Sequence, residues 1–121
     1  MKKLLITLLL VSPFSFADWG DVYYCQMTSL VDTTSDGTVG QYKLERFQFK
    51  LDSTEKAMVF GKGGYLNDWK VPLDPNRSWV LINRWWASNN YNLLLFEEGK
   101  LVSSSVGSEG ITSITANCDK F

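Results

Sequence analysis

The sequence of 121 residues contains no histidine, and this absence narrows its chemistry more than any other feature. Histidine is the usual acid-base residue at neutral pH and the commonest metal ligand in proteins. Every catalytic triad that includes histidine is therefore excluded. We expect a protein that is not an enzyme, with no catalytic residue, no cofactor and no metal site.

The sequence also lacks a large excess of either positive or negative charge. The chain has 12 lysines and arginines against 13 aspartates and glutamates, and the basic residues form no cluster. A nucleic-acid-binding domain needs a basic patch or stripe to neutralise phosphates. We therefore expect no nucleic acid partner.

Long apolar runs are limited to residues 4–11, which are too few for the roughly 20 that a membrane-spanning helix needs. Two lysines precede this run, and the small residues Ser15 and Ala17 follow it with one residue between them. This layout is typical of a cleaved secretory signal peptide. We predict removal of residues 1–17, a periplasmic or secreted protein without membrane insertion after cleavage, and one domain over residues 18–121.

Cysteine occurs only twice, as Cys25 and Cys118, near the two ends of the predicted domain. An even number of cysteines in an exported chain indicates a disulfide, since the compartment is oxidising. In the chain-entropy model a loop of this length contributes up to about 4–5 kcal/mol. We predict a Cys25–Cys118 bond.

Alternating apolar residues and frequent turn signals predict an all-β fold. Asp, Asn, Gly and Ser clusters recur roughly every ten residues, and no 3.6-residue periodicity stands out. The pattern predicts an antiparallel meander of about seven or eight strands, at residues 21–31, 41–51, 56–60, 78–87, 91–96, 100–106 and 111–118, with a further short strand around 69–71. If the cysteines join neighbouring first and last strands, the sheet loses its edges. This favours a small closed or nearly closed barrel over an open sandwich.

The segment 78–87 has the highest density of large apolar side chains in this domain. Read as one strand, it is apolar on both faces, with Trp79, Leu81 and Trp85 on one face and Val80, Ile82 and Trp86 on the other. Such a strand needs other apolar residues packed against both of its faces. We expect it to be the centre of the fold.

A change of parity is visible within residues 41–51. Its apolar residues are Tyr42 and Leu44 at even positions, then Phe47, Phe49 and Leu51 at odd positions. A strand that keeps one face inward changes parity through an extra residue, which predicts a β-bulge near Glu45 and Arg46. A less structured start to the strand is the competing interpretation.

The adjacent Trp85 and Trp86 must point to opposite faces of a regular strand. The exposed member of the pair, beside Arg84 and near Tyr91, could stack on a sugar or anchor a protein. Arg84, Trp85, Trp86 and Tyr91 are therefore our candidate binding surface. The alternative is that all five tryptophans are structural.

Several segments of the sequence resemble small exported proteins of unknown function from marine bacteria and their phages. The segments are Tyr23-Tyr24-Cys25-Gln26 and residues 44–52, 56–61 and 116–121. In layout alone, a tyrosine-cysteine start, a meander and a cysteine near the end, the chain is similar to periplasmic inhibitors of C-type lysozyme. That second resemblance implies a small barrel that inhibits an enzyme.

Three functional hypotheses follow from these patterns. The first is an exported, non-enzymatic β-barrel binding domain whose partner is a protein, a glycan or a small apolar ligand. The second is a periplasmic inhibitor of the lysozyme-inhibitor type. The third is a carboxylate-dependent hydrolase of envelope polysaccharide, since paired carboxylates are the catalytic device that remains without histidine.

Overall fold

A computed structural model describes residues 16–121 of the chain. Apolar residues recur at every second position in much of the chain, and most of the described residues therefore form strands or the turns between them. No α-helix occurs among the described residues. The elements are β1 (Val22–Thr34), β2 (Val39–Gln41), β3 (Arg46–Asp52), β4 (Ala57–Phe60), β5 (Lys70–Pro72), the 3-10 helix η1 (Val80–Ile82), β6 (Arg84–Ser88), β7 (Asn92–Glu97), β8 (Lys100–Val106) and β9 (Gly110–Lys120).

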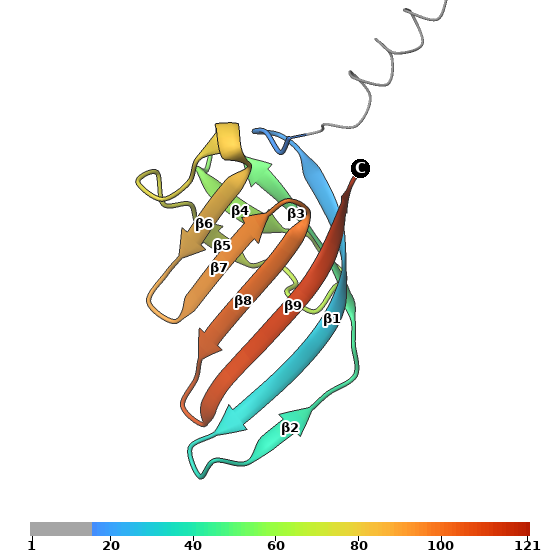
Figure 1. Cartoon of the computed structure of the whole chain (residues 1–121), viewed down its shortest axis with the longest axis vertical. Coiled ribbons are helices and arrows are strands. Elements are labelled where there is room, and N and C mark those ends of the chain that lie inside the picture. Colours follow the sequence, from blue (N-terminus) through green and yellow to red (C-terminus); the bar gives the residue numbers. More distant parts are fainter. Residues whose placement is uncertain (1–15) are drawn as a thin grey trace, which may run out of the picture.

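All strands belong to one antiparallel sheet that nearly closes into a barrel (Figure 1). The strand order is β5-β4-β3-β1-β9-β8-β7-β6, and β2 pairs with the far end of β1. The two outermost strands, β5 and β6, meet through one isolated bridge between Leu73 and Ala87, and the amide of Asp74 donates to the carbonyl of Trp86 at 2.8 Å. The predicted all-β meander and nearly closed barrel are confirmed.

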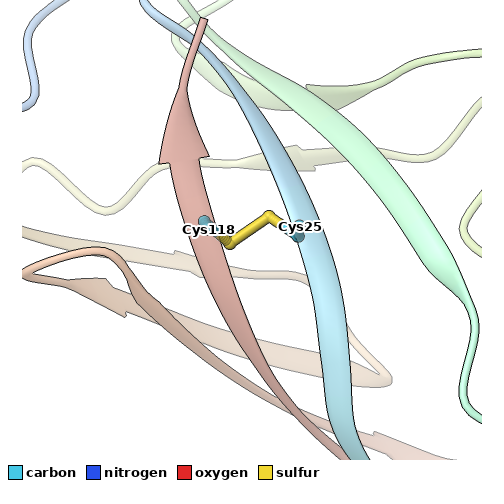
Figure 2. Close-up of a disulfide and its surroundings, with 2 residues drawn as sticks. All are labelled: Cys25 and Cys118. Atoms are coloured by element: carbon cyan, nitrogen blue, oxygen red, sulfur yellow. A yellow bond between two sulfur atoms is a disulfide. The ribbon is translucent and has the colours of Figure 1, made fainter.

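The predicted disulfide joins β1 to β9, which are neighbours in the sheet (Figure 2). Cys25 and Cys118 lie directly opposite each other, and their Sγ atoms are 2.08 Å apart. Both side chains are buried in the barrel core. The first and last strands, β1 and β9, are therefore paired, as the cysteine positions predicted.

A change from odd-numbered to even-numbered inward-facing residues occurs in β1. The buried residues of β1 are Tyr23, Cys25, Met27 and then Leu30. Between Met27 and Ser29 the register with β9 shifts by one residue, which is a β-bulge. The bulge lets Leu30 face the core after three odd-numbered residues have done so.

The predicted bulge near Glu45 and Arg46 is wrong. β2 ends at Gln41 and β3 begins at Arg46, so residues 42–45 belong to neither strand. Tyr42 and Leu44 are exposed and need not share a face with the buried residues of β3. The competing interpretation, a less structured start, describes this segment.

The prediction of one strand over residues 78–87 is also wrong. Val80–Ile82 forms η1, and Asn83 follows it in the left-handed region (φ 58°, ψ 39°). Trp79 and Arg84 exchange two backbone hydrogen bonds of 2.7 and 3.0 Å across this reversal. The apolar segment is thus a loop followed by the five-residue β6, and only β6 belongs to the sheet.

The start of the described chain is packed against the barrel. Ala17 is fully buried, and its backbone amide donates to Oδ1 of Asn83 at 2.9 Å. Most of the predicted signal peptide lies outside the described residues. Cleavage after Ala17 would remove a hydrogen bond that the buried Asn83 receives.

Within residues 16–121 the structure has no helix with the length and apolarity needed to span a bilayer.

Candidate functional site

Trp85 and Trp86 point to opposite faces of β6, as the strand geometry predicts. Trp85 is 0% exposed and belongs to the core, whereas Trp86 is partly exposed on the outer face. The guanidinium carbon of Arg77 lies 5.6 Å from the centroid of the Trp86 ring. Trp85 therefore cannot contribute to an outer binding surface, and Trp86 can.

The other two candidate residues lie toward the two ends of β6. Arg84 begins the strand and forms an ion pair with Glu97 of β7, with 3.0 Å between Nη2 and Oε1. Tyr91 is 68% exposed in the turn that follows Ser88. A strand rises about 3.3 Å per residue, so Arg84 and Tyr91 are too far apart to touch one small ligand. The structure does not bring the four candidate residues into one surface.

A more coherent site is a cavity of about 440 Å³ beside the gap between β5 and β6. We call it the seam cavity, and its lining residues are Trp19, Lys56, Leu73, Pro75, Ser78, Val80 and Trp85. These residues come from the segment before β1, the β3–β4 turn, the β5–β6 connection and β6 itself. Figure 1 shows the start of the domain and η1 at the same end of the barrel. The cavity volume falls in the range of small-molecule sites.

Two tryptophans meet at the seam cavity. The rings of Trp19 and Trp85 pack edge to face, with centroids 5.0 Å apart and planes at 88°. The indole Nε1 of Trp85 is buried and has no hydrogen-bond partner among the described residues. Buried donors of this kind are normally paired. Trp85 therefore combines a core role with an unsatisfied donor on a residue that lines the cavity.

Lys56 is the one charged side chain in the lining. Its Nζ lies 4.9 Å from the centroid of the Trp19 ring, a cation-π arrangement. Lys56 lies in the turn between β3 and β4, and its backbone is in the left-handed region (φ 53°). Among residues 16–121 it has no ion-pair partner.

Ser78, the polar neutral residue of the lining, is already engaged. Its Oγ accepts from the amide of Trp86 at 2.9 Å and donates to the carbonyl of the same residue at 3.2 Å. This pair of bonds fixes the β5–β6 connection against β6. Ser78 therefore shapes the cavity wall and offers little further hydrogen bonding.

A second hollow of about 400 Å³ lies among the loops at the other end of the barrel, and polar and apolar surface contribute about equally to its lining. Its lining includes Asp32, Asn92, Ser105 and Thr112. These groups bind one another: the Thr112 hydroxyl donates to Asp32 at 2.6 Å, and the Ser105 hydroxyl donates to Asn92 at 2.5 Å. Because these four polar side chains bind one another in pairs, this hollow is a weaker candidate than the seam cavity.

Tyr23 is the titratable side chain whose pKa departs most clearly inside the barrel. Burial, and secondarily the nearby Asp21 carboxylate, raises the pKa of Tyr23 to about 12. Its ring packs on Phe49 and Phe96, with centroids 5.5 and 4.6 Å away. Tyr23 therefore stays neutral at physiological pH and acts as a core aromatic residue.

Sequence reasoning missed most of the seam cavity. Trp19 and Pro75 lie in segments that no periodic pattern marks, and the predicted strands 56–60 and 78–87 placed Lys56 and Val80 in strands, whereas they lie in the β3–β4 turn and in η1. A usable signal was Asn83, because asparagine is one of the few non-glycine residues that readily adopts a left-handed backbone. It could have indicated that the apolar segment turns back instead of continuing as a strand.

Comparison of the chain with protein-family models, with curated proteins and with solved structures found no match. The two resemblances stated from the sequence remain predictions. In the described part of the chain, no group of three or more cysteine, aspartate and glutamate side chains is placed to hold a metal ion.

Proposed function

We propose that this protein is an exported, non-enzymatic β-barrel that binds a small apolar molecule in the seam cavity. The observation that carries the proposal is a cavity of about 440 Å³ with Trp19 and Trp85 in its lining, beside the interrupted edge of the sheet. Small-molecule sites are mostly apolar concavities with few polar groups, often at the mouth of a barrel. The seam cavity has this composition.

Export is part of the proposal, and two features support it. The N-terminal sequence has the layout of a signal peptide. The Cys25–Cys118 disulfide is compatible with an oxidising compartment. The location itself is tested by fractionating cells and identifying the first residue of the exported protein by mass spectrometry.

The test of binding uses Nile red, a neutral apolar fluorophore, and a variant that fills the cavity. Val80 lines the cavity and is partly buried, so Val80→Phe should occupy part of the cavity volume. We expect saturable Nile red binding to the wild type and binding at least about tenfold weaker in Val80→Phe, because lost apolar contact of this size costs roughly 1.4 kcal/mol or more.

Two control variants make this test specific. Val106→Phe adds the same volume at an exposed position that does not line the cavity, and it should leave binding unchanged. Val80→Ala enlarges the cavity and should retain binding. Equal binding by Val80→Phe and the wild type, with both proteins folded by circular dichroism, would contradict the proposal, as would the absence of saturable binding to the wild type.

A second candidate function is inhibition of a C-type lysozyme through the outer face of the barrel. Trp86, Leu95 and Val102 are cross-strand neighbours on β6, β7 and β8 and form a partly exposed apolar row. Exposed tryptophans beside other apolar residues are typical of protein contacts. Lysozyme inhibition that Trp86→Ala weakens would support this candidate. An undiminished lysozyme rate in a molar excess of the purified protein would remove it.

A further inference from the structure

The chemistry of the seam cavity indicates the class of its ligand. The walls are apolar or aromatic except for Lys56 and Ser78, and Ser78 is bound to the backbone of Trp86. Nζ of Lys56 has no ion-pair partner and the buried Nε1 of Trp85 has no hydrogen-bond partner among residues 16–121, and both atoms are donors. A matching ligand must supply acceptors and an apolar body.

The acidic neighbours of Lys56 are committed elsewhere. Glu55 pairs with Lys70 at 3.2 Å. Oδ1 of Asp52 accepts the backbone amides of Thr54 and Glu55, each at 2.9 Å, and its other oxygen is 4.0 Å from Nζ of Lys50. The β3–β4 turn therefore leaves Lys56 without a carboxylate of its own, so its charge can be balanced by a ligand.

We infer that the seam cavity binds a small monoanionic carboxylate with an apolar body, whose carboxylate contacts Lys56. This inference rests on the proposed function and refines it. A single lysine matches a single negative charge, whereas a dianionic phosphate is usually held by several cations or by a group of backbone amides. The apolar lining holds the remainder of the ligand against Trp19.

The position of Lys56 favours a carboxylate ligand over a neutral ligand. Its Nζ lies 4.9 Å from the centroid of the Trp19 ring, so the ammonium of this exposed residue is next to an apolar wall of the cavity. A charge-assisted hydrogen bond is stronger at such a wall than in open water, because the local dielectric is lower. A neutral ligand of equal size gains the apolar contact alone.

The test compares octanoate, octanol and octylamine, which share one chain length and differ in the head group. Calorimetric titration of the full exported protein should give the tightest binding for octanoate and the weakest for octylamine. Lys56→Gln keeps a polar side chain, one atom shorter than lysine, and removes its charge. It should weaken octanoate binding about fivefold, the value expected for one partly exposed ion pair, and leave octanol binding unchanged.

Lys62→Gln is the matched control, since Lys62 is exposed and does not line the cavity. It should bind octanoate like the wild type. Equal affinities for the three compounds, or an equal loss in both lysine variants, would overturn the carboxylate inference while the Nile red result still supports a cavity binder. Failure of all three compounds together with Nile red would overturn the proposed function itself.

Discussion

The barrel has two halves that differ in how their strands are held together. In one half, β1, β9, β8 and β7 pair along nearly their whole length, and the disulfide joins β1 to β9. In the other half, β4 has four residues and β5 three, and a single isolated bridge connects β5 with β6. We call them the sealed half and the open half.

The open half replaces strand pairing with loop contacts. The amide of Leu73 donates to the carbonyl of Lys56 at 2.8 Å, and Trp79 and Arg84 bind each other across η1. Where a ladder is interrupted, side chains from loops fill the gap less completely, and a cavity results. Binding sites are commonly placed on loops that a rigid scaffold supports. The sealed half therefore contains most of the strand pairing and the disulfide, and the open half contains the seam cavity, which is the proposed site.

The largest effect should come from Trp85, which lies where the core meets the cavity. Trp85→Ala removes a fully buried indole and should lower the free energy of unfolding by about 3–5 kcal/mol. Trp86→Ala removes a partly exposed ring that contacts Arg77, and it should cost about 1 kcal/mol or less. Denaturant titration of both variants measures the difference.

The outcome of this pair also tests the site assignment. If both substitutions destabilise the protein equally, Trp86 is as structural as Trp85, and the outer row has no special claim to binding. If neither substitution destabilises the protein, β6 does not contribute to the core, and Trp85 is not a wall of the seam cavity.

The disulfide should give the next largest effect, and it separates the halves. Replacing Cys25 and Cys118 together by alanine should lower the free energy of unfolding by about 2–4 kcal/mol. Because the bond lies in the sealed half, Nile red binding to the folded double variant should remain close to that of the wild type. Loss of binding at unchanged fold would show that the two halves are coupled.

Much of the sealed half could be predicted from the sequence. Strand alternation between Asn92 and Lys120 is punctuated by clear turns, and Gly99 has the positive φ (76°) that a short hairpin favours. Cys25 and Cys118 indicated which strands are neighbours. Local signals were sufficient for β7, β8 and β9 because each of them pairs with the next strand along the chain, and the cysteines supplied the distant pairing of β1 with β9.

The open half could not be predicted in the same way. The apolar residues 78–87 have strand propensity, but the left-handed Asn83 and its contact with Ala17 turn the segment into a loop. The cavity joins residues from four separate segments of the chain, and no local pattern encodes such a meeting. The β1 bulge was also difficult to predict from the sequence. Its extra residue, Thr28, is recognised only because it has no partner in the register between β1 and β9.

The last predicted effect, smaller than those of Trp85 and of the disulfide, concerns Ala17, which connects the predicted cleavage site to the open half. A chain that starts at Asp18 leaves Oδ1 of Asn83 without the 2.9 Å donor that Ala17 supplies. Asn83 is only 7% exposed, so this loss should cost about 1–2 kcal/mol relative to a chain that starts at Ala17. Asn83→Gly keeps the left-handed backbone without the acceptor, and it should shrink the difference between the two chains in a double-mutant cycle. Equal stability of the two original chains would mean that water replaces the Ala17 amide, and that the segment before Asp18 contributes nothing to the end of the barrel where the cavity lies.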